Sequence, residues 1–397
     1  MAVLEVGSPL TAEERIAKRK LILKDTMSLV GLSLITAALA ALTYFMFDSF
    51  SRHRMELAQR WLVRGEAAMA AGHPFQAIEP LRSALEYKPA RRETEIELAT
   101  ALAAAGDNQE AISYFNSLHE LEPGNGLVNL QLARLAVKQS NEGEAVLDYQ
   151  RALDGTWQGD GYVRRLAVRQ ELARYLIARK EYPQARTQLL IAAGNAPDDP
   201  AIKTEIAGLL EEAEDMQSAL EIYRGVADEH KPAPLNALEG AGRTAFALGR
   251  FELAQQYLQA AVNHSGFAAQ AEATRTANQA MLAETNRLLE LFPGRELRPD
   301  LRATRILYAA RMAHQRLEDC TRNPDMVAKL DELSGEWQKI SASLKPRLVE
   351  GDPELAERVL RLAFDTEKQT AQLCGAPTGD DALLLKIAQA PNEVEQQ

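Results

Sequence analysis

The chain has 397 residues, of which 46% are hydrophobic and 6% aromatic, and its formal net charge is -11. An acidic chain without a basic cluster argues against nucleic acid as a ligand, because nucleic-acid binding depends on many Lys and Arg contacts to phosphate. Ala, Leu, Glu and Arg are abundant, and few runs rich in Val, Ile and Thr reach strand length, so we expect an all-α protein.

The first predicted element is an uncharged apolar run over residues 27–47, between Asp25 and Asp48. As a helix it is about 31 Å long, which matches the hydrocarbon core of a bilayer. The alternative is a cleaved signal peptide, but the run is longer than such segments usually are and no small-x-small cleavage site follows Phe47. We therefore predict one uncleaved transmembrane helix after a short charged tail, residues 1–26.

Basic residues on the two sides of this run predict its orientation. Five of them precede it in a tight cluster and four follow it: Arg15, Lys18, Arg19, Lys20 and Lys24 before, and Arg52, Arg54, Arg60 and Arg64 after. The positive-inside rule then favours a cytoplasmic N-terminus. We predict a single-pass protein of a bacterial inner membrane, with the bulk of the chain in the periplasm.

An alanine recurs at a spacing of 34 residues after the apolar run. The series is Ala77, Ala111 and Ala145, and it continues after one step of 40 with Ala185 and Ala219. A fixed period of 34 residues is the signature of tetratricopeptide repeats, in which each period is a pair of antiparallel helices, A and B.

The first period resembles the tetratricopeptide consensus in its spacing. Its matching residues are Trp61, Gly65, Gly72, Ala77, Leu81, Ala84 and Pro89. Small residues at the eighth and twentieth positions let the two helices approach closely, and the turn glycines Gly72, Gly106 and Gly249 fit a left-handed end to helix A. The pattern recurs in phase, so residues 55–265 are identified as an α-solenoid of about six tetratricopeptide helix pairs.

The resemblance implies a concave groove lined by helix A. The side chains that the family pattern turns into this groove are apolar with scattered cations: Leu62, Met69, Ile96, Leu127, Leu130, Arg134, Val137, Lys138, Arg174, Ile177 and Arg243. Such a surface suits an amphipathic helix or an extended peptide. The alternative is that some of these residues only pack neighbouring helices. Glu66 and Glu97 stand where repeats that grip a chaperone's C-terminal carboxylate need cationic or amide groups, so that ligand is not expected.

The step of 40 between the third and fourth repeats comes from a glycine-rich loop over residues 154–161 that contains Trp157. Two interpretations stay open. The indole is packed against its own repeat above a bulge, or the loop is a binding element.

After Gly266 the period fades. We expect a helical region over residues 266–376, either degenerate repeats or a cap, with helices at 268–291, 300–320, 324–349 and 353–374, followed by a tail, 377–397. If the last three helices run up, down and up, Cys320 and Cys374 lie at the same end. A disulfide is then geometrically allowed and would fit an oxidising compartment; two buried free thiols are the alternative.

No pattern for catalysis, a cofactor or a metal stands out. The six histidines show no paired spacing, and two isolated cysteines make no zinc site. The stretch Gly240–Ala245 superficially fits a dinucleotide loop, but it follows two prolines and lies in phase as helix A of the sixth repeat. We expect no enzyme activity, no cofactor and no small-molecule substrate.

Protein–protein interaction is therefore the predicted function, as a membrane-anchored scaffold that holds clients or assembles a complex of the cell envelope. Its expected partners are membrane or periplasmic proteins. A permanent structural subunit of a large envelope complex is the first alternative, and exposed apolar patches on helix B would favour it. A remote alternative is an enzyme with an unrecognised C-terminal module.

Overall fold

The computed structural model describes residues 11–88 and 91–390. In these residues the prediction of an all-α protein is confirmed: every regular element is helical, and a single isolated β-bridge joins Asn125 to Thr156. The chain divides by compactness into two units, Met1–Gly161 and Tyr162–Gln397, and each unit is described by itself.

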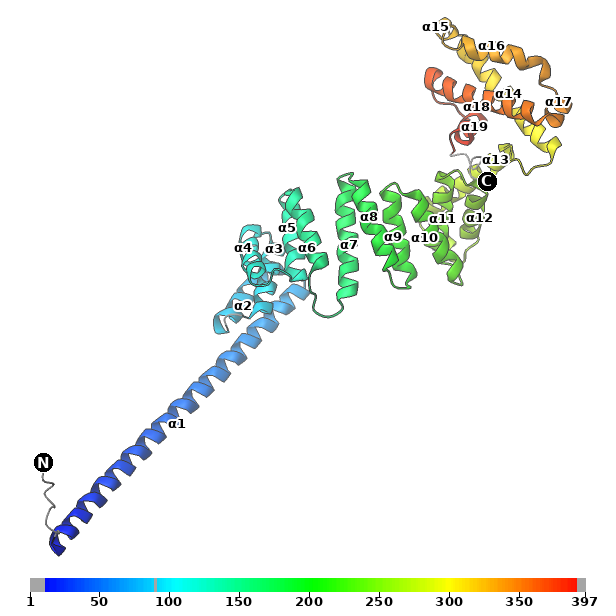
Figure 1. The fold of residues 1–397 in the computed structure, drawn as a ribbon. Helices are drawn as coiled ribbons and strands as arrows, with labels where there is room; N and C mark the ends of the chain where they lie inside the picture. The colour runs from blue at the N-terminus through cyan, green and yellow to red at the C-terminus, as the bar shows by residue number, and fades with distance from the viewer. Residues whose placement is uncertain (1–10, 89–90, 391–397) are drawn as a thin grey trace, which may run out of the picture. The chain divides into compact units, whose positions relative to one another are not determined.

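Unit 1 begins with one helix of 59 residues, α1 (Ala12–Ala70) (Figure 1). The prediction separated a charged tail, a transmembrane helix and the first repeat helix, but in the structure residues 12–70 of these three parts form one helix without a break. Thr11 caps the start, together with Glu14. Past the apolar run the helix continues because no Gly or Pro interrupts residues 48–64 and oppositely charged side chains lie one turn apart, as in the ion pair of Arg60 with Glu56.

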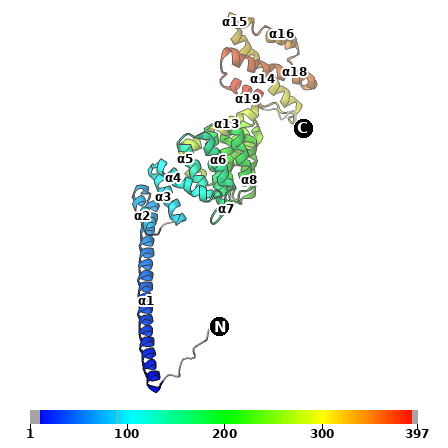
Figure 2. The ribbon, with the colours of Figure 1, turned by 60° about the vertical axis from the view of Figure 1, so that its left-hand side comes forward.

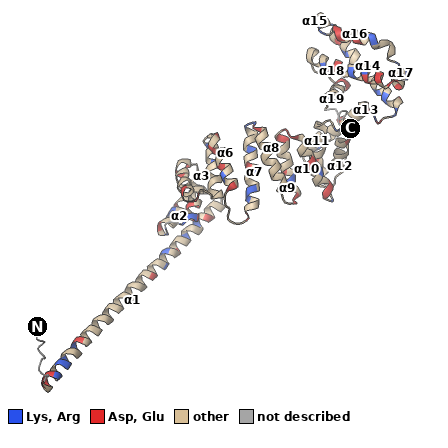
Figure 3. Ribbon diagram, in the orientation of Figure 1, with Lys and Arg blue, Asp and Glu red and all other residues tan. Residues whose placement is uncertain are grey.

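The apolar part of α1 has the length and composition of a membrane span, and none of its most apolar 18-residue window is buried in the structure. Figure 3 shows it as a stretch without charged residues, between charged ends. Every large apolar side chain there is more than half exposed, with Leu29 at 67% and Phe47 at 70%.

The rest of unit 1 is a row of antiparallel helices that pairs α1 with α2, α3 with α4, and α5 with α6. Their bounds are α2 (Pro74–Tyr87), α3 (Arg92–Ala105), α4 (Asn108–Leu121), α5 (Gly126–Lys138) and α6 (Glu142–Asp154). The small residues predicted at the helix contacts lie there. A side chain carbon on Gly65 would stand 2.6 Å from Leu81 Cγ, and Ala77, Ala111 and Ala145 are fully buried.

Unit 2 begins with three more pairs, which are drawn in green in Figure 1. They are α7 (Gly161–Ala178) with α8 (Tyr182–Gly194), α9 (Pro200–Glu212) with α10 (Met216–Glu229), and α11 (Leu235–Ala247) with α12 (Phe251–Val262). Gly242 repeats the relationship of Gly65, because a side chain carbon there would lie 2.7 Å from Leu258 Cγ. A proline follows the end of helix B at Pro123 and Pro197, since α4 and α8 both end before them. Pro89 lies outside the described residues.

The turn after helix A has one residue in the left-handed conformation in all six pairs. The predicted glycines are confirmed, with φ of 74° at Gly72, 97° at Gly106 and 75° at Gly249. The other three pairs use ordinary residues at the same place: Ser140 at 58°, Lys180 at 62° and Glu214 at 60°. The glycines in the sequence therefore predicted three of these six turns.

The C-terminal part of unit 2 contains a short 3-10 turn, Phe267–Ala269, and the helices α13 (Glu272–Leu291), α14 (Pro299–Thr321), α18 (Pro353–Cys374) and α19 (Asp380–Gln389). The expected helix over 324–349 is wrong. That segment is divided into α15 (Pro324–Val327), α16 (Asp331–Ile340), a 3-10 turn and α17 (Pro346–Gly351), because Pro346 starts a new helix.

The interpretation of residues 377–397 as a tail is also wrong for its first part. Residues 380–389 form α19, and its Leu384 and Ile387 are buried in a core that runs from Phe251 on α12 through α13, α14 and α18. Residues 391–397 lie outside the described residues. Figure 2 shows these C-terminal helices next to α13, which follows the last repeat pair. A shared core thus covers the last helix pair of unit 2.

Candidate functional site

The groove residues predicted in unit 1 recur at matching positions of α1, α3 and α5, so that Leu62, Ile96 and Leu130 lie 34 residues apart. We call Leu62, Met69, Ile96, Leu127 and Leu130 the apolar stripe. Leu62 and Leu130 retain only 6% and 7% of their exposure, so they pack mainly between neighbouring helices. Met69, Ile96 and Leu127 are half-buried and keep apolar surface open.

The cations predicted beside the stripe are partly engaged within unit 1. Lys138 donates from Nζ to the carbonyl oxygen of Ala103 at 2.8 Å, which ties α5 to the end of α3. Arg134 lies one turn before Lys138 on α5, with an exposed side chain. Lys138 therefore has a structural role that the sequence pattern did not indicate.

Carboxylates lie beside the apolar stripe on the same helices, α1 and α3. Burial raises the pKa of Glu97 on α3, and the negative charge of Glu66 on α1 raises it further. The Oε2 atom of Glu97 is buried and has no hydrogen-bond partner within the described residues. This part of unit 1 thus presents apolar surface together with negative charge.

The predicted groove positions of unit 2 are polar and internally paired. Arg174 on α7 forms an ion pair with Glu205 on α9. Arg243 on α11 donates to both carboxylate oxygens of Glu211 on α9, at 2.9 and 2.7 Å. Ile177, on the last turn of α7, is half-buried. The predicted cations of unit 2 therefore bridge consecutive helix pairs.

The glycine-rich loop between the third and fourth repeats favours the packing interpretation. The Trp157 indole lies against Gly126 at the start of α5 and donates from Nε1 to the carbonyl oxygen of Ala152 at 2.9 Å. Thr156 pairs with the backbone on the same side, since its N–H donates to Gly124 O at 2.7 Å. Only glycine leaves room for the indole at position 126.

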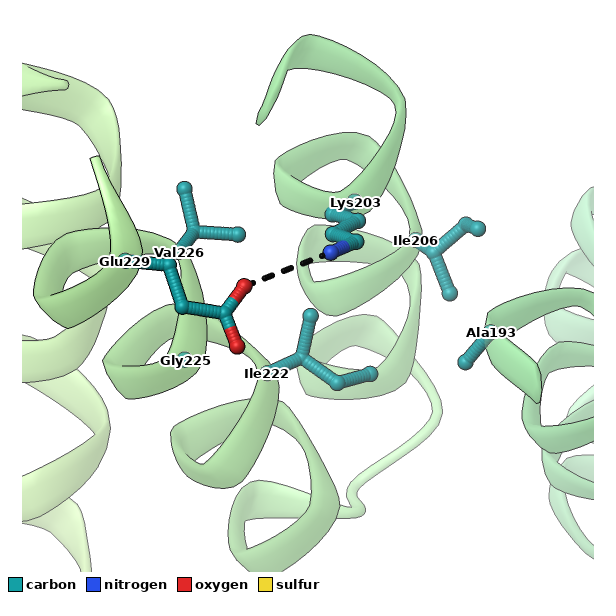
Figure 4. Close-up of a pocket in the computed structure, with 7 residues that line it drawn as sticks. All are labelled: Ala193, Lys203, Ile206, Ile222, Gly225, Val226 and Glu229. Carbon is teal, nitrogen blue, oxygen red and sulfur yellow. Dashed lines mark ion pairs between the residues drawn. The ribbon is translucent and has the colours of Figure 1, made fainter. Parts of the chain in front are cut away.

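A pocket that the sequence did not indicate lies between α8, α9 and α10 (Figure 4). It holds about 180 Å³ and is mostly apolar, with an ion pair of Lys203 and Glu229 at 3.5 Å on its wall. Its other lining residues are Ala193, Ile206, Ile222, Gly225 and Val226. On α8, Leu190 is 48% exposed and Ile191 38% exposed. The pocket is thus formed by two B helices, α8 and α10, and by the A helix α9.

The glycine stretch Gly240–Ala245 lies inside α11, as its phase in the repeats predicts. Gly240 faces the ring of Tyr223 and Gly242 faces Leu258, so both glycines are needed for packing. Among the described residues, no group of three or more His, Cys, Asp or Glu side chains has the arrangement of a metal site.

Cys320 and Cys374 lie at the ends of α14 and α18 and form a disulfide in the structure, with Cα atoms 5.9 Å apart. Beside it, Arg316 on α14 donates to Thr370 Oγ1 at 2.9 Å and to the carbonyl oxygen of Gly375 at 2.6 Å. The two helices are thus joined at this end by a covalent bond and by a guanidinium.

Successive antiparallel helix pairs in phase, with small residues at each contact, define a helical-repeat protein of the α-solenoid class. The family model of the tetratricopeptide repeat matches residues 62–126, 96–160 and 171–234. Residues 62–160 and 171–234 are therefore tetratricopeptide repeats, as their repeat spacing predicts.

Solved structures with a similar fold share little sequence with this chain. PilF of Pseudomonas aeruginosa is 20% identical over 57% of this chain and 99% of its own, with a TM-score of 0.39. PilW, a type IV pilus biogenesis factor, is 17% identical over 57% and 97%, with a TM-score of 0.38. YrrB, a tetratricopeptide protein with an unusual peptide-binding site, is 17% identical over 50% and 97%, with a TM-score of 0.37. A search of curated proteins gave no match.

Proposed function

We propose that this protein is a membrane-anchored tetratricopeptide scaffold that binds a helix or extended peptide of another envelope protein on the apolar stripe of unit 1. The observation that carries the proposal is the continuity of α1, which joins an exposed apolar segment of membrane-spanning length to helix A of the first repeat. Leaving so many large apolar side chains in water is unfavourable by about 25 cal/mol per Å² of apolar surface. A bilayer removes that penalty.

The orientation with a cytoplasmic N-terminus and a periplasmic body is part of the proposal. It is supported by the cluster of cations before the apolar run. The disulfide between Cys320 and Cys374 is consistent with an oxidising compartment, since thiols in the cytoplasm are kept reduced.

The chemistry of the stripe indicates which side chains a bound partner segment would carry. Met69, Ile96 and Leu127 offer apolar contacts on three successive A helices, while Glu66 and Glu97 add negative charge next to them. A segment with apolar side chains on one face and a Lys or Arg beside them fits this surface, because its cation would meet the negative charge of the exposed Glu66 beside Glu97. A segment ending in an acidic group would be repelled.

The test uses the full chain in its native membranes, with a photoreactive amino acid replacing Ile96. Leu147 on α6, which is 40% exposed, gives a matched control position on a B helix of the same unit. Crosslinks to one envelope protein from position 96 and none from position 147 would support the proposal. Ile96→Glu should abolish recovery of that protein, and Leu147→Glu should leave it unchanged.

Two further results would count against the proposal. Extraction of the protein from membranes at alkaline pH, without detergent, would refute anchoring by α1. Equal crosslinking from positions 96 and 147 would refute a specific site on the stripe.

A second candidate function is a permanent subunit of a larger envelope complex, docked through the B-helix side of unit 2. The observation that favours it is the exposure of Leu190 and Ile191 on α8, the helix that contributes Ala193 to the apolar pocket. In this case Leu190→Glu with Ile191→Glu would release the protein from the complex, while Ile96→Glu would not. The complex would also be recovered at fixed stoichiometry.

A further inference from the structure

The C-terminal end of unit 2 contains a buried acid that neither the repeats nor the proposed binding surface explains. Glu367 on α18 has no exposed surface, and neither of its carboxylate oxygens has a hydrogen-bond partner within the described residues. A buried charged carboxylate without partners is strongly unfavourable, so such a group normally neutralises by taking up a proton.

The groups around Glu367 do not supply enough positive charge. Arg316 on α14 is the one cation paired with it, at 3.6 Å from Nε to Oε2, and that guanidinium already donates to Thr370 and Gly375. Asp381, on α19, also interacts with Arg316 and has a buried oxygen without a partner among the described residues. Two carboxylates thus share one guanidinium.

The remaining charges at this junction are already paired or are negative. Asp380 on α19 accepts hydrogen bonds from Arg287 on α13, at 3.1 and 2.6 Å, and from the Tyr308 hydroxyl on α14 at 2.7 Å. Asp319 on α14 adds negative potential at Asp381. Farther along α19, Lys386 pairs with Glu284 on α13. None of these neutralises the second carboxylate of the Glu367–Asp381 pair.

We propose that α19 is a proton-dependent latch, which docks on α18 with one proton held by the Glu367–Asp381 pair and is released as the pH rises. With one carboxyl protonated, the pair carries a single negative charge that Arg316 balances. With both ionised, one negative charge is left buried. Undocking of α19 removes Asp381 from the pair and lets water reach Glu367, so both carboxylates can ionise.

The connections around α19 would allow it to undock while α14 and α18 stay together. The disulfide of Cys320 with Cys374 and the contacts of Arg316 hold α14 and α18 together without any part of α19. The connection to α19 is the short segment between Gly375 and Gly379, both of which have positive φ, at 95° and 61°. Glycines at these places allow the segment to swing while the helices it joins stay intact. Release would uncover the apolar residues Leu384 and Ile387 for a partner.

The direction of the pH effect follows from the two states of Glu367. Burial, and then the charge of Asp381, raise the pKa of Glu367 from 4.5 to about 7 in the docked state. Between about pH 4.5 and pH 7 the docked state therefore binds one proton more than the undocked state. The docking equilibrium constant should be at its full value below about pH 4.5, fall by up to about tenfold per pH unit, and level off above about pH 7.

The experiment is hydrogen exchange with mass spectrometry on the full chain, at several values between about pH 5 and 8, with each rate corrected for the intrinsic effect of pH. The protection factor of peptides from 380–390 should fall by about ten- to a hundredfold between pH 5 and 7, while α10 of the same protein stays constant. Glu367→Gln should make the protection of α19 independent of pH. Asp365→Asn, an exposed acid on the same helix, is the matched control and should behave as the wild type.

Two outcomes would overturn the latch: constant protection of α19 over this range in the wild type, or the same decline in Glu367→Gln. If Glu367→Gln fails to fold, Asp381→Asn provides the same test from the other helix. Infrared difference spectra of the wild type between pH 5 and 8 should also show a protonated carboxyl that the Glu367→Gln protein lacks. All of these readouts are independent of membrane anchoring and of the apolar stripe.

Discussion

Arg243 on α11 grips the carboxylate of Glu211 on α9 with two hydrogen bonds, and the Tyr223 hydroxyl donates to the same carboxylate at 2.8 Å. Burial, and then the charge of Glu211, hold the pKa of Tyr223 well above its usual value, so the phenol stays protonated as a donor. The arrangement joins helices of two consecutive repeats, and Glu211 is 14% exposed in it. Arg243, which was predicted to face a ligand, therefore binds a carboxylate of the protein itself.

We predict that Arg243→Gln lowers the stability of unit 2 by about 1–2 kcal/mol, because Glu211 loses a bidentate partner in a mostly buried place. Urea unfolding of the full chain in detergent would measure it. Arg361→Gln, at an exposed position on α18, is the control. Normal stability together with weaker partner binding would show instead that Arg243 contacts the ligand.

The left-handed turns give a second prediction. Lys180 and Glu214 adopt the positive φ that Gly72 and Gly106 adopt in other repeats. A side chain in this conformation is unfavourable by about 1 kcal/mol, so Lys180→Gly and Glu214→Gly should each raise the midpoint of thermal unfolding.

The reciprocal change should have the opposite sign. Gly106→Ala places a side chain at a φ of 97° and should destabilise unit 1 by a similar amount. A loss of stability in Glu214→Gly would mean that its side chain makes a contact worth more than the backbone strain.

Close helix contacts give a third prediction. Gly65→Ala would place a carbon 2.6 Å from Leu81 Cγ on the facing helix, so α1 and α2 must separate or Leu81 must shift. We expect a loss of about 1–3 kcal/mol, measured by urea unfolding. Gly143→Ala on α6 is a fair comparison, because nothing lies within 4 Å of the added carbon, and it should stabilise the protein by about 0.5–1 kcal/mol.

The disulfide gives a fourth prediction. Cys320 and Cys374 are separated by 54 residues, and closing a loop of that size stabilises a fold by about 2–4 kcal/mol. Cys320→Ser with Cys374→Ser should therefore lower the melting temperature of the C-terminal helices and leave unit 1 unaffected. Alkylation before and after reduction, followed by mass spectrometry, would test the bond in protein taken from native membranes. Labelling of both thiols without reduction would contradict it, and would also weaken the proposed periplasmic location.

The repeat phase was predictable because close helix contacts require particular small residues at fixed spacing. Gly65, Ala77 and Gly242 therefore mark the fold in the sequence as clearly as in the structure. The turns at Lys180 and Glu214 were not predictable, since other parts of the repeat force those residues into a conformation that they do not favour.

The ion pairs between successive repeats could not be predicted from the sequence, for a different reason. Arg174 and Arg243 have the side chains of ligand-binding cations, and only the distance between successive helices shows that Glu205 and Glu211 meet them. The period also ends before α13, so the contacts of the C-terminal helices could not be placed. The role of Glu367, in particular, depends on Asp381, which comes from a segment interpreted as a tail.

The unbroken course of α1 has a geometric consequence for an anchored protein. A helix without a hinge transmits both height and direction, since each residue adds about 1.5 Å of rise and about 100° of rotation. One residue added between Phe47 and Ala58 would turn the apolar stripe away from a neighbour in the membrane, whereas seven would lift it by about 10 Å and return it to nearly the same bearing. The number of residues between bilayer and first repeat would thus set both the height of the repeats above the membrane and the direction in which the stripe faces.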